Sequence, residues 1–373
     1  MRRLKLKRRQ WVLAVLIAAV TAFRLVPGLG MVYTRNIYPV IGALLSHLSG
    51  FVPFAVGDIF ISLSIVWVVA WPCYAIMHRK ERARKALGRV GEYLLWVYVW
   101  FYAAWGLNYS QPNIYRRIGM APAKVDKEAF RRFAYNYADS LNAAFARLGK
   151  GALRPDTTVG ISKEKAEAAI QNGYWKAGQH TSELGINTPF NNCPRAKTMV
   201  FSRLSSMAGV TGSMGPFFCE FTLNADLLPH SYPATYAHEM AHLLGIANEG
   251  EANFYSYVVC TSSEDEATRF SGYYHIFFHV VNNVRGLLGE EEYGRFISRF
   301  RPEIIALARH DSHYWMSLRS SVVDEAQTFV YSLYLKGNNV EGGLRSYSSV
   351  IGIIMAWENK KSGLENHVSL VGK

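Results

Sequence analysis

The sequence is short of cysteine, and its few cysteines are far apart. Only four occur in 373 residues, at positions 73, 193, 219 and 260, and none belongs to a Cys-x-x-Cys pair. A zinc ribbon or a disulfide framework requires closely and regularly spaced cysteines. The sequence therefore argues against both. If their domain lies outside the cytoplasm, Cys193 and Cys219 have the alternative of forming one disulfide, although a buried thiol is favoured for each.

Acidic residues are outnumbered, with 28 Asp and Glu against 41 Lys and Arg, for a net charge of +13. The excess is not spread evenly. Residues 1–9 and 79–85 together hold eleven basic residues and one acidic residue, Glu81, which nearly accounts for it. Both clusters border long apolar runs, a pattern typical of cytoplasmic flanks beside membrane spans. The expected partner is therefore a lipid bilayer and not a nucleic acid.

Three apolar segments predict transmembrane helices, at residues 11–33, 55–77 and 91–109. The second is the clearest, because residues 59–77 carry no charge and approach the ~20 residues that cross a ~30 Å hydrocarbon core. A cleavable signal peptide is the alternative for the first segment. The third is rich in Trp and Tyr, which favour the membrane interface, and a buried soluble helix is the alternative there.

The basic clusters also predict an orientation. Positive charge is retained on the cytoplasmic side, so both clusters should lie inside and the chain after residue 109 should emerge outside. The predicted localisation is a multi-pass protein of the bacterial cytoplasmic membrane, with its larger domain on the outer face. Losing one of the three spans would move that domain inside.

Residues 110–373 contain no further stretch that is both long and apolar enough to span, and are predicted to form an extracytoplasmic domain. Apolar residues at helical spacing predict helices, whereas two β-favouring runs predict a small sheet. The expected helices cover residues 126–148, 161–170, 264–288, 290–308 and 320–336, and the expected strands 198–204 and 217–223. The expected fold class is thus N-terminal transmembrane helices followed by a mainly helical α+β domain with a small sheet.

The strongest chemical signal is His-Glu-Met-Ala-His at positions 238–242. On a helix, residues four apart share a face, so His238 and His242 can bind one Zn²⁺ ion. Glu239 lies beside the open coordination position, where it can act as general base for a zinc-activated water. A chance match on an exposed helix is the alternative. The apolar neighbours favour a buried site, because burying these polar groups without partners costs several kcal/mol.

A third metal ligand is expected shortly after the motif, and Gly245 allows the necessary turn. Glu249 is preferred, with Asn253 placed four residues on to orient a histidine. Glu251 is the alternative ligand, although with Asn248 as N-cap it also fits a capping box. A ligand at position 248 would suit a different peptidase class, but asparagine binds zinc poorly.

Two further roles are predicted from motif order. Tyr273 or His275, following Phe270-Ser271-Gly272, would stabilise an oxyanion, and Tyr273 is preferred. His275 and His279 are four apart with aromatic residues between them, which favours a structural helix face. The segment 217–224 precedes the catalytic helix and is either a strand that pairs with extended substrate or a plain core strand.

Several segments resemble a known family: WGLNYSQP (105–112), SRLSSMAGVTGSMGPF (202–217), HEMAH, GIANEGEANFYSY (245–257), FSGYY (270–274), and YLK with GGLRSYS (334–348). Together they are similar to bacterial membrane proteins of the domain of unknown function 3810, with a site pattern like that of gluzincin peptidases. The resemblance covers most of the chain from about residue 90. It implies an N-terminal membrane region and a zinc-peptidase-like domain, and no substrate.

The leading functional hypothesis is a membrane-anchored zinc metallopeptidase with one catalytic Zn²⁺ ion, which hydrolyses peptide or protein substrates. The alternative is a zinc-stabilised sensor or scaffold that binds peptides without cutting them. Glu239 discriminates between the two, because a structural zinc site needs no general base and fills its fourth position with a protein ligand. The sequence does not indicate the cleavage preference or the oligomeric state.

Overall fold

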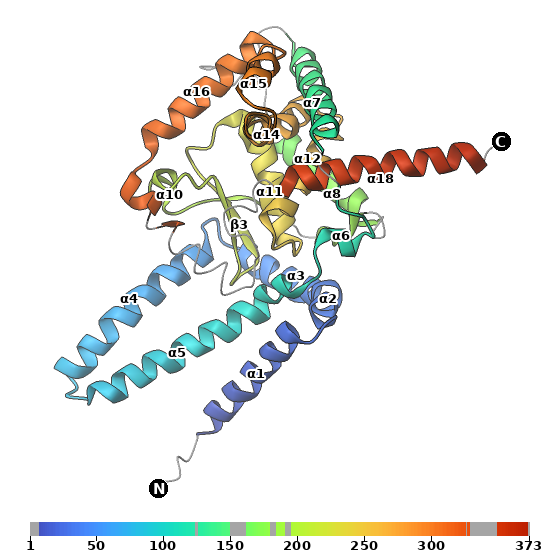
Figure 1. Cartoon of the computed structure of the whole chain (residues 1–373). Helices are drawn as coiled ribbons and strands as arrows, with labels where there is room; N and C mark the ends of the chain where they lie inside the picture. Colours follow the sequence, from blue (N-terminus) through green and yellow to red (C-terminus); the bar gives the residue numbers. More distant parts are fainter. Residues whose placement is uncertain are drawn as a thin grey trace. The chain divides into compact units, whose positions relative to one another are not determined.

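The computed structural model describes most of the chain (Figure 1). The described residues are 7–123, 126–149, 162–179, 184–190, 195–325, 327–328 and 349–371. Cys193 and the segment 334–348 of the family resemblance therefore lie outside the described residues. The chain divides into two compact units. The first comprises Met1–Pro112, Phe190–Val200 and Met214–Thr222, and the second Asn113–Pro189, Phe201–Ser213 and Leu223–Lys373. The first unit ends near the predicted boundary, but it also takes in two later segments that no sequence pattern indicated.

The first unit consists mainly of helices. They are α1 (Arg8–Leu25), α2 (Leu29–Val32), the π-helix η1 (Tyr33–Ile37), α3 (Tyr38–Gly50), α4 (Val56–Met77), α5 (Ala83–Ala104) and the 3₁₀ helix η2 (Gly106–Ser110). The start of α4 is anchored by a buried carboxylate: Glu220 Oε1 accepts from Gly57 N at 2.6 Å. The other oxygen of Glu220 pairs with Lys197 Nζ at 2.5 Å. Cys219, beside Glu220, is a buried free thiol.

One described helix, α4, is long and apolar enough by itself to cross a membrane. The helix α1 and the segment Leu29–Gly50 reach the required length and hydropathy only when they are taken together, and the pair is bent by 106°. They therefore account for at most one further span. Helix α5 is not apolar enough to count as a span, because charged residues occupy its first turns and its apolar part is rich in aromatic residues of low hydropathy. The composition thus supports one spanning helix, and the three-span arrangement with its orientation stays a prediction.

The second unit is also mainly helical. Its helices are α6 (Ile114–Arg117), α7 (Lys127–Arg147), α8 (Lys163–Gln179), α10 (Ser202–Met207), η3 (Pro229–Ser231), α11 (Tyr232–Leu243), α12 (Glu249–Thr261), α13 (Glu266–His275), α14 (Phe277–Leu288), α15 (Glu290–Ile297), α16 (Pro302–Leu318) and α18 (Ser349–Val371). The predicted helix 126–148 is confirmed as α7. Asp126 caps it by accepting from Ala129 N at 2.6 Å, and Phe130, Phe133 and Leu141 are buried along one face.

Two predicted helices are each broken in two. The segment 264–288 divides at Ile276, whose backbone (φ −94°, ψ 4°) leaves the helical region between α13 and α14. The segment 290–308 divides before Pro302, which begins α16. Proline fixes φ and lacks an N–H, so it is tolerated in the first turn of a helix but interrupts an interior. Periodicity alone did not reveal these breaks, because both halves continue the apolar pattern.

The small sheet is confirmed, but its composition differs from the prediction. Its strands β1 (Lys197–Thr198), β2 (Gly212–Gly215) and β3 (Glu220–Leu223) have the order β1-β3-β2. The strand predicted over 198–204 is wrong beyond Thr198, since α10 begins at Ser202, and β2 forms between the two predicted strands, where none was predicted. Because β3 is central, both of its edges are already paired. The predicted pairing of the segment 217–224 with substrate is therefore wrong, and a core strand is confirmed.

Candidate metal centre

The His-Glu-Met-Ala-His motif lies on α11, as predicted from its spacing. Pro233 occupies the first turn of this helix, and nearly every residue of α11 is buried. Gly245 follows with φ +96°, a conformation that glycine adopts without strain, and reverses the chain. Helix α12 then begins at Glu249 and packs against α11. This turn brings the residues after the motif back to its histidines.

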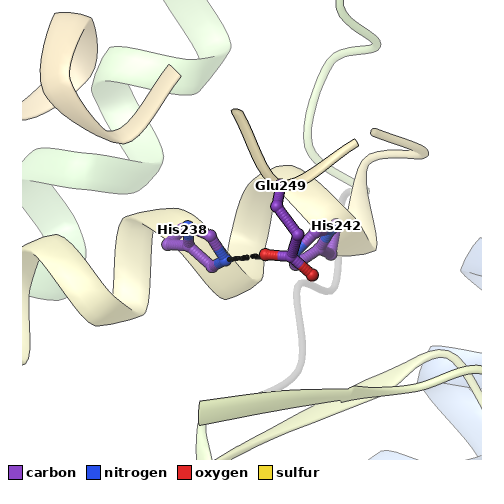
Figure 2. A group of neighbouring side chains, drawn as sticks. All are labelled: His238, His242 and Glu249. Carbon is purple, nitrogen blue, oxygen red and sulfur yellow. Dashed lines mark hydrogen bonds and ion pairs between the residues drawn. The ribbon is translucent and has the colours of Figure 1, made fainter. Parts of the chain in front are cut away.

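Three side chains of the second unit converge at one point. His238 Nε2 lies 3.1 Å and His242 Nε2 3.5 Å from Glu249 Oε2. The two Nε2 atoms are 3.0 Å apart. Figure 2 shows both imidazoles on α11 with the Glu249 carboxylate facing them. The structure therefore brings together the three residues predicted to be metal ligands, whose ligand atoms all lie within 4.8 Å of one another.

Hydrogen bonds on the far side of each ring orient the histidines. His238 Nδ1 lies 2.8 Å from Asn253 Oδ1, and His242 Nδ1 lies 2.6 Å from the carbonyl oxygen of Ile246. A carbonyl oxygen only accepts, so each Nδ1 carries a proton, and each Nε2 faces Glu249 and becomes available to a metal when it is deprotonated. The predicted contact of Asn253 with a histidine is thus present. Outer partners of this kind hold metal ligands in orientation.

The spacing of the three atoms suits a tetrahedral zinc ion. Ligands bound at ~2.0–2.1 Å in a tetrahedron are separated by roughly 3.3 Å. The separations here, 3.0, 3.1 and 3.5 Å, lie on both sides of that value. Two imidazole nitrogens and one carboxylate are also the donor set of open zinc sites, which keep a fourth position for water or substrate. The residues present therefore fit zinc.

The charges of the cluster are strongly coupled. Burial by itself lowers the pKa of the His242 imidazole, but the adjacent Glu249 carboxylate outweighs burial and raises that pKa to about 9. Burial likewise raises the pKa of Glu249, yet the two histidines hold it well below its usual range. The carboxylate thus stays ionised beside the histidines.

Glu239 is a buried carboxylate with unused hydrogen-bonding capacity. Its side chain points from α11 into the interior, 5% exposed, and Oε2 has no hydrogen-bond partner among the described residues. Burial raises its pKa. Gly212 of β2 lies directly against it, since a Cβ added at Gly212 would stand 2.4 Å from Oε1. A buried acceptor without a partner is rare and calls for a ligand or a chemical role.

Glu251, the alternative third ligand, is engaged elsewhere. Its Oε1 accepts from Ile114 N at 2.8 Å and its Oε2 from Arg117 Nη2 at 2.6 Å. The guanidinium of Arg117 is itself buried, with 1% of the side chain exposed. The predicted N-cap is confirmed, because Asn248 Oδ1 accepts from Glu251 N at 3.1 Å. This geometry favours Glu249 over Glu251 as the ligand.

Tyr273 and His275 both lie on α13, and their contacts differ. The Tyr273 ring packs edge-on against Tyr257, at 5.7 Å between centroids. Among the described contacts it has none with the motif, so its oxyanion role stays a prediction without geometric support. His275 Nε2 lies 2.8 Å from Asn253 Oδ1, the atom that also binds His238. The interpretation of His275 as part of a helix face shared with His279 is wrong, because the helix is interrupted between them.

Gly212 was not predicted from sequence, and His275 was predicted only as the alternative to Tyr273 for the oxyanion role. Gly212 lies in a glycine-containing run that signals only a turn or linker, and its contact with Glu239 depends on where β2 lies. His275 was visible as a histidine after the FSGYY segment, but its contact with Asn253 required α12 and α13 to pack together. Neither pairing has a sequence spacing that would reveal it.

Comparison with known proteins bears on the family alone. No curated protein and no solved structure matches the chain. A family described as protein of unknown function (DUF3810) matches residues 33–355, which is most of the chain. The match agrees with the resemblance carried by the motifs, and the chain is a member of the DUF3810 family.

Proposed function

We propose that the protein is a membrane-anchored, zinc-dependent peptidase with its catalytic residues on α11 and α12. One observation carries the proposal: the buried Glu239 carboxylate, with an oxygen that has no partner, follows directly on a histidine of a three-residue cluster whose geometry suits zinc. A purely structural zinc site gives no reason for this carboxylate to be buried there.

The roles of the residues follow from their positions. His238, His242 and Glu249 would hold the ion, and Asn253 keeps the His238 ring oriented. Zinc supplies a lowered pKa for water and polarises a carbonyl group. Glu239 takes a proton from the attacking water and later gives it to the leaving amine. A carboxylate whose pKa is raised by burial is a stronger base than an exposed one, which suits it to take the proton from the water.

The sheet supports a peptide as the substrate. Strand β2 lies at an edge of the sheet, and its residue Gly212 contacts Glu239. An extended peptide can add to such an edge through backbone hydrogen bonds, and the absence of a side chain at Gly212 lets the strand lie directly against the carboxylate. We therefore assign to β2 the substrate-pairing role that the sequence had suggested for the segment 217–224.

The proposal also includes the location of the protein in the membrane. The α4 helix supports attachment to a membrane, and the basic flanks favour a multi-pass arrangement with residues after 109 outside the bacterial cytoplasmic membrane. A tag-accessibility assay tests this orientation. Protection of a C-terminal tag from an added protease in spheroplasts would place the domain inside instead.

The primary test uses the full-length protein in detergent, because two segments of the larger domain's sequence belong to the first unit. The purified protein should contain about one zinc ion per chain, as expected of a three-ligand catalytic site. It should also release peptides from casein, lose that activity on chelation and regain it with added zinc. Lack of zinc under metal-replete conditions would contradict the proposal. Zinc without hydrolysis of any peptide substrate would favour the binding module instead.

Replacing Gly212 with alanine should impair hydrolysis without loss of metal. The new Cβ would stand 2.4 Å from Glu239 Oε1, and its three nearest neighbours are all atoms of Glu239, so the carboxylate must move. A displacement of about 1 Å in a catalytic group costs roughly 10²-fold in rate. Steady-state kcat and zinc content of Gly212→Ala measure this.

The matched control is Gly286→Ala on α14, where an added Cβ meets nothing within 4 Å. It should leave both kcat and zinc content at the wild-type level. An unchanged kcat in Gly212→Ala would show either that Glu239 takes no part in the reaction or that β2 does not lie against it.

A further inference from the structure

Two basic segments that are far apart in sequence lie at one end of the helices in the first unit. Arg9, at the start of α1, pairs with Glu92 of α5, with Nε and Oε1 2.6 Å apart. Arg24, near the other end of α1, donates to Tyr98 Oη of α5 at 3.0 Å. The helices α1 and α5 therefore run in the same direction, and α4 runs back beside α5 (Figure 1). The start of α1 and the turn between α4 and α5 consequently lie at the same end.

This end carries a large positive charge, and we call its nine basic residues the basic end. They are Lys7, Arg8, Arg9, Arg79, Lys80, Arg82, Arg84, Lys85 and Arg89. All are exposed except Arg89, which is half-buried. Among the described residues, only two acidic residues pair with the basic end: Glu81, which also lies 3.8 Å from Lys85, and Glu92 of α5. Glu92 pairs with Arg9, and Glu81 with Arg89 at 3.0 Å, so most of the positive charge has no acidic partner nearby in these segments.

Aromatic rings lie next to these charges. The guanidinium carbon atoms of Arg79 and Arg89 lie 5.5 and 5.7 Å from the ring centre of Trp71. Trp67 stacks on Trp71 at 6.0 Å. The Trp71 Nε1–H is buried and has no hydrogen-bond acceptor among the described residues. Arg89 is already paired with Glu81, whereas Arg79 has no ion pair among the described residues. The free Arg79 guanidinium and the unused Trp71 N–H therefore call for a negatively charged oxygen acceptor.

The surface continuous with the basic end is apolar. Only 6% of the apolar window of α4 is buried. Leu63, Ile65, Val66 and Val69 are each 60–64% exposed along it. Tryptophan prefers the level of lipid headgroups, and basic side chains beside an apolar helix reach towards phosphate at that level. This combination distinguishes the surface from a nucleic-acid site, which has no need of an adjoining apolar helix.

We propose that the basic end is a binding site for anionic phospholipid headgroups, with Arg79 and the Trp71 N–H as its centre. This inference rests on the proposed membrane anchoring and goes beyond it, because it requires selection of anionic over zwitterionic lipid. The ligand is the phosphate of a lipid such as phosphatidylglycerol in the leaflet that faces the basic end.

The test measures lipid affinity of the full-length protein in neutral detergent, by native mass spectrometry during titration with phosphatidylglycerol or phosphatidylcholine. The variant Arg79→Gln/Arg84→Gln/Lys85→Gln should bind phosphatidylglycerol on the order of 100-fold more weakly, because each basic residue near an anionic membrane surface contributes about a fivefold factor. Trp71→Phe, which removes the N–H donor but keeps an aromatic ring, should weaken phosphatidylglycerol binding severalfold. Phosphatidylcholine binding should change in neither.

The matched control removes the same charge from exposed residues of the second unit, as Arg132→Gln/Lys176→Gln/Arg309→Gln. It should bind phosphatidylglycerol like the wild type. Equal affinity of the wild type for both lipids, or equal loss in both triple variants, would overturn the proposal. A separate experiment tests the anchoring itself. If alkaline carbonate without detergent releases the wild-type protein from membranes, the protein is not anchored by a spanning helix.

Discussion

The variant Glu239→Gln is expected to retain zinc and to lose peptide hydrolysis by roughly 10²- to 10⁴-fold, the range typical of removing a general base. Glutamine keeps the size of the side chain and removes its ability to take a proton. The side chain is buried against Gly212, so an isosteric replacement should not alter the packing. The measurement is kcat on casein or a fluorogenic peptide, together with zinc content.

The control for this variant is Glu303→Gln on α16, which removes one carboxylate from an exposed position, 50% accessible. It should leave kcat at the wild-type level. Hydrolysis that survives in Glu239→Gln would show that another group takes the proton. Loss of zinc from Glu239→Gln would instead show that this carboxylate is a ligand.

The variant Glu249→Gln is expected to lose both zinc and activity. Its Oε2 lies 3.1 and 3.5 Å from the two histidine nitrogens, and it is the anionic member of the cluster. A neutral amide supplies no charge to offset that of the ion. The loss of zinc affinity should therefore exceed the 10–100-fold that is typical when only an outer partner of a ligand is removed. Competition with a chromophoric chelator measures the zinc affinity.

The matched control is the double variant Arg117→Gln/Glu251→Gln in the same region of the second unit. Removing one member of a buried ion pair costs about 3–5 kcal/mol because the other charge is left uncompensated, whereas removing both is often tolerated. The double variant should therefore keep zinc and kcat, with any change confined to the melting temperature. If it loses zinc while Glu249→Gln keeps it, Glu251 is the third ligand.

Some residues of the candidate metal centre could be predicted from the sequence, and others could not. A spacing of four within one helix places His238 and His242 on one face whatever the rest of the fold does, so the motif was sufficient for both. Glu249 and Asn253 were predicted only as preferences, because their approach depends on the turn at Gly245 and on how α12 packs. His275 and Gly212 reach the site from α13 and β2, through contacts that no local pattern encodes.

The sheet shows the same limit. The residues 220–223 have β-favouring side chains and were predicted as a strand, but β2 is the run Gly-Ser-Met-Gly, which has little intrinsic strand preference. It becomes a strand through its backbone hydrogen bonds to β3. Which strand is central and which is an edge is a property of pairing, and the sequence of a single segment does not reveal it.

The amino-acid sequence by itself determined the helical character of the chain, the apolar α4, the two basic clusters and the helix that carries His238, Glu239 and His242. These features depend on interactions within a few turns of one element, or on transfer of a segment between water and lipid, and both are local. Tertiary structure alone placed Glu249, and not Glu251, beside the two histidines, buried Glu239 against Gly212 and brought both basic clusters to one end of α1 and α5. These depend on contacts between segments distant in sequence, whose geometry is fixed by packing and by the pairing of buried polar groups.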